Sequence, residues 1–391
     1  MARATEGRNG LVRPLAAAIL ANAMAGLLYV WSLFILPLET GLQLNRAALG
    51  AVSSLALVTF TIGVFLLPPV LRRLGHAGTA AFVTVLIGGG HVAFGLLPGL
   101  ASLFIFYGVA FGVGSGLAYG LALALAAALP DGTRAKAIGL VLSAFAMSGI
   151  LLPLLLGKWV AATDPAHAFM TIGLWVLLPG LLCLALLWSG VGQQPGKAEA
   201  KAASAVPAPD IPFFVLSFAF FSICFVGLAI VSQVAAMAAA AGLAAPAQSA
   251  TALTVGYLLG SLIGAPLADR GGERSMIALL GLMTGAGAAA MLSGNSGVFL
   301  AGSLLQGLAF GGSGAVLPVL IGRRYGSSHI PAVYGRMMFA YGLAGLTAPG
   351  IAGALYAAYG SYTITLALCV LLAALAIVSA LFLTRRPALA R

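Results

Sequence analysis

The chain has 391 residues, of which 61% are apolar and only 7% charged, and its formal net charge is +11. A water-soluble fold of this length cannot bury so large an apolar fraction, so the composition excludes a soluble enzyme or binding module. The basic residues stand singly or in pairs between apolar runs, which excludes the clustered basic face of a nucleic-acid-binding protein.

In chain order, the first half contains six apolar runs of about 20 residues or more, each long enough to cross a bilayer as a helix. These spans are predicted at 14–38, 47–71, 78–98, 101–129, 136–158 and 167–189. The first run follows Arg8 and Arg13, but it continues to Leu38 and is too long for the apolar region of a signal peptide. We therefore predict a spanning helix there.

Near the middle of the chain, residues 190–212 read GVGQQPGKAEAKAASAVPAPDIP, a Gly-, Pro-, Ala- and Lys-rich composition typical of a solvated linker. Six further spans follow, predicted near 213–241, 247–268, 275–294, 297–321, 333–358 and 362–384. The domain prediction is therefore an N-terminal six-helix half at 1–189, a cytoplasmic linker at 190–212 and a C-terminal six-helix half at 213–391.

The basic residues indicate the orientation. With twelve spans and both termini cytoplasmic, only Arg46 and Lys158 of the 19 Lys and Arg residues fall outside. A wrong number of spans would scramble this positive-inside bias. We therefore expect an all-α, multi-pass protein of the cell membrane, specifically a bacterial inner membrane, and the net charge reflects topology rather than a partner.

The two halves are predicted to be parallel repeats. The fifth and eleventh spans share the motif G-x3-P-x3-G at an offset of 196 residues, formed by Gly149, Pro153 and Gly157 and again by Gly345, Pro349 and Gly353. AFGVGSG at 110–116 matches AFGGSG at 309–314, and the loop at 71–75 matches the loop at 268–272.

The loop after the eighth span has the form G-x-x-x-A-D-R-G-G-x-R. Its fixed positions are Gly264, Asp269, Arg270, Gly272 and Arg274. This loop motif, together with the arrangement of six plus six spans, resembles the major facilitator superfamily. The resemblance covers nearly the whole chain. GLLYVWSLFILPLE at 26–39 and GVGSGLAYG at 112–120 resemble its oxalate/formate antiporter and monocarboxylate porter branch.

The resemblance implies the major facilitator fold and transport by alternating access, in which two halves rock about a site near the bilayer midplane. It implies that the repeated Gly-Pro helices form the hinge. The loop residues Asp269 and Arg270 would lock one state through ion pairs. The plain alternative for that loop is a positive-inside segment with one acid.

Polar residues inside the spans are the candidate substrate contacts, because an unsatisfied polar group is costly in lipid. They are Asn22 and Tyr29 in the first span, Ser115 and Tyr119 in the fourth, Gln233 in the seventh, Tyr257 and Ser261 in the eighth, Gln306 in the tenth, and Arg336 and Tyr341 in the eleventh. Alternative roles stay open for three kinds of residue. Tyr29 could belong to an interfacial belt, the two glutamines could bond neighbouring helices, and Arg336 could extend to the membrane surface.

Arg336 is the sharpest candidate, because its counterpart in the first half is Leu140 and the resemblance implies a basic residue on helix eleven that holds a carboxylate. Relatives that carry carboxylates usually have a second arginine in helix eight, but residues 257–268 hold no charge. No Asp or Glu lies deep in any span either, which disfavours dianions and typical proton-coupled drug export.

The first functional hypothesis is therefore a transporter of a small organic solute, above all a monocarboxylate-like anion. The alternatives are export of apolar or amphipathic compounds and a non-transporting assembly factor on the same fold. An enzyme is not expected, because the four histidines lie apart and no carboxylates pair within the spans. No cofactor or metal is expected, since the three cysteines lack ligand spacing. The expected partners are the solute and the lipid bilayer, with a coupling proton or counter-anion left open, and the expected state is a monomer.

Overall fold

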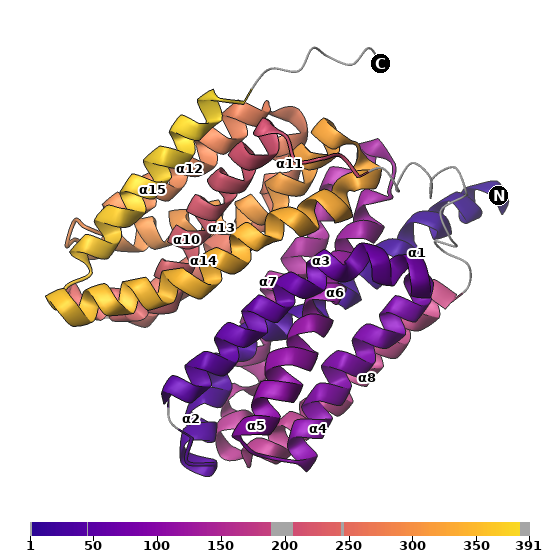
Figure 1. Ribbon diagram of the computed structural model, residues 1–391, viewed down its shortest axis with the longest axis horizontal. Coiled ribbons are helices and arrows are strands. Elements are labelled where there is room, and N and C mark those ends of the chain that lie inside the picture. The colour runs from indigo at the N-terminus through magenta and orange to yellow at the C-terminus, as the bar shows by residue number, and fades with distance from the viewer. Residues whose placement is uncertain (1, 45, 189–205, 244–245, 384–391) are drawn as a thin grey trace. The chain divides into compact units, whose positions relative to one another are not determined.

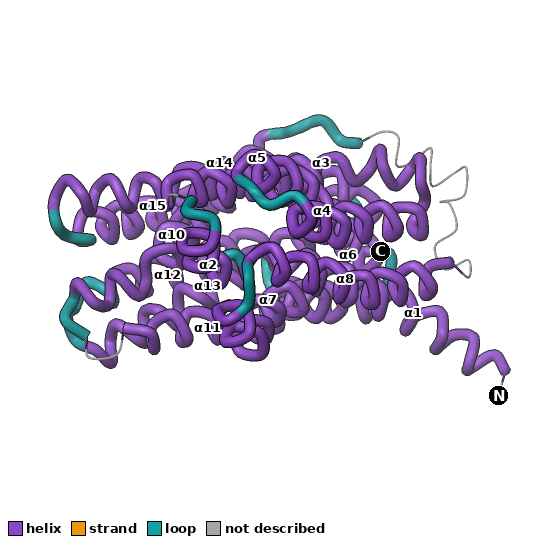
Figure 2. The backbone as a smooth tube through the Cα atoms, turned by 90° about the horizontal axis from the view of Figure 1, so that it is seen from below, coloured by secondary structure: helices purple, strands orange, loops and turns teal. Residues whose placement is uncertain are grey.

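The computed structural model describes residues 2–44, 46–188, 206–243 and 246–383, and the described residues contain helices and no strand. Figure 1 labels the main helices, and Figure 2 shows that short loops join most of them. Residues 190–205 of the predicted linker lie outside the described part. The prediction of an all-α fold is confirmed.

Six predicted spans of the first half correspond to helices of the structure. The elements are α1 (Ala2–Ala25), η1 (Gly26–Val30), α2 (Ser32–Gly41), α3 (Arg46–Thr84), η2 (Val85–Gly89), α4 (Gly90–Leu96), α5 (Leu100–Ser102), η3 (Leu103–Phe111), α6 (Gly112–Ala127), α7 (Asp131–Ala162) and α8 (Pro165–Trp188). The element α3 joins two predicted spans across Gly75, whose φ of 66° only a glycine adopts easily.

The second half is more regular. Its elements are α10 (Ile211–Ala240), α11 (Pro246–Arg270), α12 (Glu273–Ala290), α13 (Ser296–Tyr325), η4 (Ser327–His329), α14 (Ile330–Tyr359) and α15 (Thr363–Leu381). Asp210 caps α10, since its Oδ1 accepts a hydrogen bond from the Phe213 N–H at 2.9 Å.

Nine helical stretches among the described residues are long and apolar enough to cross a membrane. One of them, residues 48–96, contains two predicted spans. The two predicted spans that do not reach these criteria, 136–158 and 275–294, are nevertheless covered by α7 and α12. A helix thus exists for every predicted span, and the crossing number of twelve stays a prediction.

The first predicted span is not one uniform α-helix. A 3-10 segment, η1, separates α1 from α2, and it begins at Gly26. A Cβ on Gly26 would lie 2.5 Å from the Phe145 carbonyl oxygen of α7, so the close approach of these two helices requires glycine. Because a 3-10 segment changes the helical period, the positions of Asn22 and Tyr29 do not follow one continuous α-helical face.

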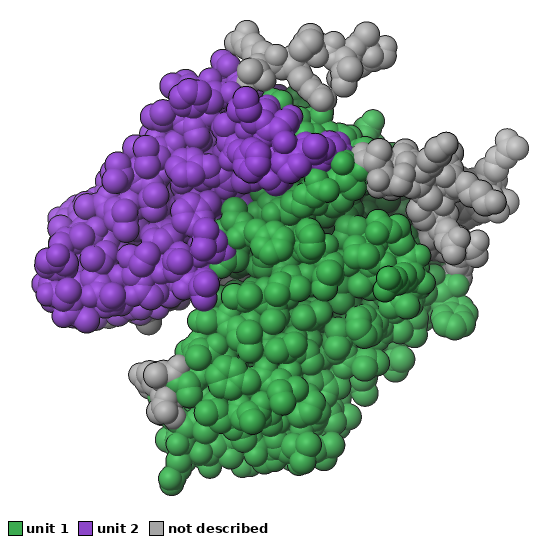
Figure 3. Space-filling model, viewed as in Figure 1, with its two compact units in different colours: residues 1–206, 321–342 green, residues 207–320, 343–391 purple. Residues whose placement is uncertain are grey.

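The described residues form two compact units, coloured separately in Figure 3. Unit 1 contains residues 1–206 and 321–342, and unit 2 contains 207–320 and 343–391. The division passes through α13 and α14, so the first turns of α14 belong to the same unit as the first half of the chain. The domain boundaries predicted from the sequence remain an expectation.

Glycine contacts reveal the repeat inside each unit. In unit 1, a Cβ on Gly116 of α6 would collide with the Phe60 carbonyl oxygen of α3. In unit 2, a Cβ on Gly311 of α13 would collide with the Tyr257 carbonyl oxygen of α11. The same kind of contact therefore occurs where the fourth span meets the second and where the tenth span meets the eighth. The sequence match of 110–116 with 309–314 stays a prediction, because such glycine contacts recur on successive turns: a Cβ on Gly112 would lie 2.8 Å from the Ala56 carbonyl oxygen.

Candidate functional site

Five aromatic side chains of unit 1 meet in one buried group, here called the aromatic cluster. Its members are Phe60 of α3, Tyr119 of α6, Phe145 of α7, and Tyr334 and Tyr341 of α14, and each is at most 7% exposed. Phe60 is the centre, with ring centroids 5.5 Å from Tyr119, 6.1 Å from Phe145 and 6.2 Å from Tyr341. These distances suit edge-to-face and tilted aromatic packing.

The cluster contains a hydroxyl pair. The hydroxyl oxygens of Tyr119 and Tyr334 are 3.1 Å apart and buried, and the two rings are nearly parallel with centroids 6.3 Å apart. Tyr119 lies on the fourth predicted span and Tyr334 at the start of the eleventh. A buried hydroxyl needs a partner, and each tyrosine supplies one to the other.

Small residues bring these helices close enough for the rings to meet. A Cβ on Gly335 would lie 3.1 Å from the Val64 carbonyl oxygen, and one on Gly342 would lie 2.6 Å from Thr61 Oγ1. Together with Gly116 against Phe60, these contacts bring both α6 and α14 close to α3. The aromatic cluster therefore depends on these glycines, which allow the helices to approach, as well as on the aromatic residues themselves.

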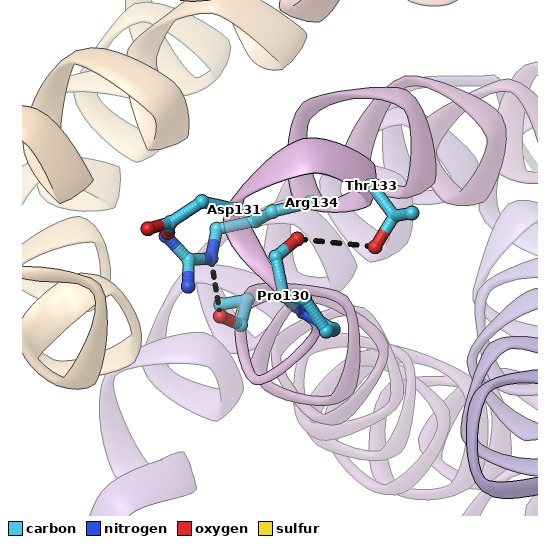
Figure 4. Close-up of polar contacts among 5 residues, drawn as sticks. Pro130, Asp131, Thr133 and Arg134 are labelled. Carbon is cyan, nitrogen blue, oxygen red and sulfur yellow. Dashed lines mark hydrogen bonds and ion pairs between the residues drawn. The ribbon is translucent and has the colours of Figure 1, made fainter. Parts of the chain in front are cut away.

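A polar turn fixes the junction of α6 and α7, as Figure 4 shows. Arg134 makes an ion pair with Asp131, and its Nε donates to the Ala127 carbonyl oxygen at 2.7 Å. A cation beside the C-terminal carbonyls of α6 is favoured by the helix dipole. Thr133 Oγ1 also donates to the Pro130 carbonyl oxygen at 3.0 Å. This turn links the helix of Tyr119 to the helix of Phe145.

Two predicted contacts in unit 1 retain unused hydrogen-bonding atoms. Asn22 is fully buried, and its Nδ2 donates to the Val141 carbonyl oxygen at 2.7 Å, whereas its Oδ1 has no partner among the described residues. Ser115 is also fully buried, and its Oγ has no partner among them. An unpaired buried polar atom costs about 1–3 kcal/mol, so these atoms mark places that a water or a solute group would satisfy. The side chain of Tyr29 lies outside what the structure describes.

In unit 2, three predicted contacts bond to neighbouring helices. Gln306 Nε2 donates to the Thr284 carbonyl oxygen at 2.5 Å, and Ser261 Oγ donates to the Gly311 carbonyl oxygen at 3.3 Å. Gln233 Oε1 accepts from the Tyr362 hydroxyl at 3.1 Å. These bonds fit the packing role that the sequence left open for the glutamines.

Tyr257 is the remaining predicted contact in unit 2, and its ring packs edge-to-face on Phe310 with centroids 5.2 Å apart. Whether it, or any other predicted residue, contacts a substrate stays a prediction.

Arg336 and Tyr341 do not share a face of α14. Tyr334 and Tyr341 are seven residues apart and lie in the aromatic cluster, whereas Arg336 is two residues from Tyr334, roughly 200° around the helix. Arg336 is half-buried and lies on the side of Leu343, which is 54% exposed. Arg336 is therefore not a member of the aromatic cluster. Its anion-binding role remains a prediction.

The predicted hinge glycines are not tightly packed where the structure describes them. A Cβ on Gly157 would meet only Leu33 Cδ2 at 3.7 Å, and one on Gly353 would meet nothing within 4 Å among the described residues. Both α7 and α14 run as continuous helices through the positions of Pro153 and Pro349. Bending at these helices remains a prediction, as does the hinge role of Gly149 and Gly345.

The loop pair Asp269 and Arg270 ends α11, and both side chains are exposed. Within the described residues the structure gives neither of them an ion pair. Nearby, Arg274 Nε donates to the Leu383 carbonyl oxygen at 2.5 Å, which ties the start of α12 to the end of α15. The predicted lock by Asp269 and Arg270 is still a prediction.

Sequence reasoning missed Phe60, Phe145 and Tyr334. The spacing of seven between Tyr334 and Tyr341 was a signal, because residues seven apart lie on one helix face. Phe60 and Phe145 carried no such signal, since a lone phenylalanine in an apolar run is ordinary lipid-facing or core composition.

The comparisons with known proteins agree with this architecture. Residues 213–391 match the sequence profile of the Major Facilitator Superfamily, and no curated protein matches the chain in sequence. The proton:xylose symporter XylE, bound to 6-bromo-6-deoxy-D-glucose, is similar in structure with a TM-score of 0.71 and 18% identity, covering 96% of this chain and 94% of that one.

The transporter FucP in its outward conformation is similar with a TM-score of 0.69 and 15% identity, covering 95% of this chain and 98% of that one. A variant of the Escherichia coli fucose:proton symporter FucP gives the same values. With helices this long and apolar, the chain is a multi-pass membrane protein. Over nearly its whole length it has the fold of the major facilitator superfamily, and its C-terminal half matches that family in sequence as well.

Proposed function

We propose that this protein transports a small organic solute across the membrane by alternating access. The observation that carries the proposal is the fold, which extends over 95–96% of the chain and is shared with solute carriers. Two buried polar atoms on the first and fourth spans, Asn22 Oδ1 and Ser115 Oγ, have no partner among the described residues and support a solute site among those helices. Family membership of the whole chain is part of this proposal.

The substrate class that we propose is a monocarboxylate-like anion. The support is the placement of Arg336 on the eleventh span together with the lack of any Asp or Glu deep in a predicted span. A guanidinium holds a carboxylate through two parallel hydrogen bonds, which an ammonium cannot reproduce. One arginine balances one negative charge, so a dianion is a poorer fit.

Uptake into proteoliposomes tests both statements. Purified protein would be offered labelled acetate, lactate and benzoate, labelled oxalate as the dianion, and labelled xylose and fucose as neutral solutes. Saturable uptake of the monocarboxylates that exceeds that of empty liposomes is expected. Saturable uptake of no solute in the panel, by protein that is folded and inserted, would contradict the transport proposal for these classes.

Arg336 variants test the anion. Arg336→Gln is expected to weaken the apparent affinity for the transported anion by about 30- to 1000-fold, because losing a charge-assisted pair costs roughly 2–4 kcal/mol. Arg336→Lys is expected to weaken it less. The matched control is Arg323→Gln, which removes an exposed charge at the end of α13. Unchanged affinity in Arg336→Gln would remove this residue from the site.

A second candidate is a neutral, amphipathic solute. The observation that favours it is the uncharged character of the aromatic cluster, together with the position of Arg336 on the opposite side of α14 from Tyr334 and Tyr341. Rings and hydroxyls bind such solutes by area and by a few hydrogen bonds. Saturable uptake of the neutral solutes, unaffected by Arg336→Gln, would favour this candidate.

A further inference from the structure

One segment from the second half of the chain belongs to the compact unit of the first half. Residues 321–342, which include η4 and the first turns of α14, group with residues 1–206 (Figure 3). The rest of α14, from Leu343 onward, groups with unit 2. A single helix is thus divided between the two units, and specific contacts hold its first turns to the first half of the chain.

Glycines give the first turns of α14 close contact with α3. A Cβ on Gly335 would lie 3.1 Å from the Val64 carbonyl oxygen, and one on Gly342 would lie 2.6 Å from Thr61 Oγ1. The contact positions run in opposite directions along the two helices, so α3 and the start of α14 are antiparallel neighbours. Helices that meet through glycine approach each other at the backbone.

Aromatic rings line both edges of this contact. On one edge, Phe339 packs edge-to-face on Phe65 with ring centroids 5.2 Å apart, and both rings are exposed. On the other edge, Tyr334 and Tyr341 belong to the buried aromatic cluster. Each such ring pair adds attraction beyond the area that it buries. The first turns of α14 are therefore held by rings on both sides of a glycine contact.

The hydrogen bond between α6 and α14 joins two neutral groups. The hydroxyl oxygens of Tyr119 and Tyr334 are 3.1 Å apart, so one hydroxyl donates its hydrogen to the other. A phenol hydroxyl is uncharged near neutral pH, unlike the carboxylate and guanidinium of an ion pair. This bond therefore holds the two helices together without the kind of ion pair that the sequence predicted for a lock at Asp269 and Arg270.

The corresponding position of the first half lacks this hydroxyl. At the offset of 196 residues that relates the two Gly-Pro motifs, the counterpart of Tyr334 on α7 is Ile138. An isoleucine side chain offers no hydrogen bond. The hydroxyl pair is therefore not duplicated at that position, and a contact that exists on one side only favours one of the two end states of a transporter.

We propose that Tyr119, Tyr334 and the rings around Phe60 form a lock without charge. It holds the first turns of α14 to α3 and α6 in one end state of transport and opens in the other, an inference that rests on the proposed function. The start of α14 is cytoplasmic in the predicted topology, so the lock acts on that side. On opening, the two hydroxyls separate and each bonds to water. The bias is then about that of one hydrogen bond and a few ring contacts, which a transport cycle can reverse.

Distance measurements in lipid nanodiscs test the lock without a solute. Spin labels on Arg73→Cys, just before the kink of α3 at Gly75, and on Ser328→Cys, just before α14, report whether the start of α14 is near α3 or separated from it. Both labelled positions are exposed. Tyr119→Phe and Tyr334→Phe are each expected to raise the ratio of separated to near molecules by about 2- to 10-fold, the equivalent of one lost hydrogen bond.

The matched control is Tyr362→Phe in unit 2, which also removes a hydrogen-bonded hydroxyl, the one that donates to Gln233 at 3.1 Å. It should leave the two populations unchanged. The shift in Tyr334→Phe should be equal at about 50 mM and about 500 mM salt, because salt screens charges and leaves a neutral contact unaffected. Unchanged populations in both lock variants, an equal shift in the control, or a shift that disappears at high salt would each overturn the proposal.

A cross-link tests whether the lock has to open during transport. A Cβ on Gly342 would lie 3.1 Å from the Thr61 Cβ, close to the spacing of two cysteines in a disulfide. In Thr61→Cys/Gly342→Cys, oxidation is expected to leave only the near population and to stop exchange of any solute that passes the uptake panel. Reduction is expected to restore both, so the reduced protein is the control for folding. Full exchange by oxidised protein whose disulfide has formed would overturn the proposal.

The two proposals fail separately. If no solute passes the panel, the transport proposal fails, and the distance measurements still decide whether the tyrosine pair biases the position of α14. If exchange occurs while the distances do not respond to the tyrosine variants, transport stands and the lock is wrong.

Discussion

The two repeats share their backbone packing and differ in the side chains that this packing presents. Gly116 against the Phe60 carbonyl in unit 1 has its equivalent in Gly311 against the Tyr257 carbonyl in unit 2. Three residues after these glycines, the first repeat has Tyr119 and the second has Gly314. Glycine contacts at helix crossings thus occur in both repeats, whereas the tyrosine occurs in one.

This difference separates two kinds of position. Where two helix backbones approach closely, only a residue without a Cβ fits, so a glycine recurs at such crossings in each repeat. A tyrosine such as Tyr119 is not demanded by the helix crossing, because the second repeat does without it. At such positions we expect the chemistry specific to this protein.

The largest expected effect comes from filling the shared glycine contacts. Gly116→Ala and Gly311→Ala would each place a methyl group against a backbone carbonyl, and each is expected to cost about 1–3 kcal/mol of stability. Thermal unfolding in detergent, followed by the yield of monodisperse protein, measures it.

The control for that comparison is Gly350→Ala, where a Cβ would meet nothing within 4 Å among the described residues. This variant should be neutral or slightly stabilising, since alanine favours a helix by about 1 kcal/mol. If Gly116→Ala were harmful and Gly311→Ala harmless, the packing of the two repeats would not be equivalent.

The second expected effect concerns the repeated Gly-Pro helices. If they bend during transport, Gly149→Leu and Gly345→Leu should each lower the transport rate severely while folded protein still reaches the membrane, because a bulky side chain blocks close approach of helices. Uptake per folded molecule is the measurement. Gly353→Leu is the control in the same motif as Gly345, because a Cβ on Gly353 would meet nothing within 4 Å among the described residues. Normal transport rates in both Gly149→Leu and Gly345→Leu would show that the Gly-Pro motif serves helix packing and not bending.

A smaller effect is expected for the hydroxyl pair. Tyr119→Phe and Tyr334→Phe should each lower stability by about 1 kcal/mol, because each leaves the other buried hydroxyl without this partner. The double variant should cost less than the sum of the two, as expected for residues in contact. Tyr257→Phe in unit 2 is the control. Additive losses would show that the two hydroxyls do not act as a pair.

The smallest perturbation tests topology. Single cysteines introduced at Ala198 in the linker and at the exposed Arg270 should react with a thiol reagent only from the cytoplasmic side, since both lie among inside-facing basic residues. The three native cysteines are buried and provide a low background. Reaction of either position from the opposite side would contradict the arrangement of twelve spans.

The sequence by itself determined the membrane class, the helical fold and the existence of a helix for each predicted span. The physical reason is that a bilayer forces every backbone group to bond within its own segment, so length and apolarity are nearly sufficient. The same argument explains why the linker stood out and why the basic residues indicate an orientation.

Only the tertiary structure decided which side chains meet. The sequence favoured Arg336 because a charge in an apolar run is conspicuous, yet the buried group around Phe60 is built from residues with ordinary composition. Contacts between helices depend on crossing positions and rotation about each helix axis, which many Gly- and Ala-rich sequences fit equally well. Tyr334 opposite Tyr119 therefore became visible only in three dimensions.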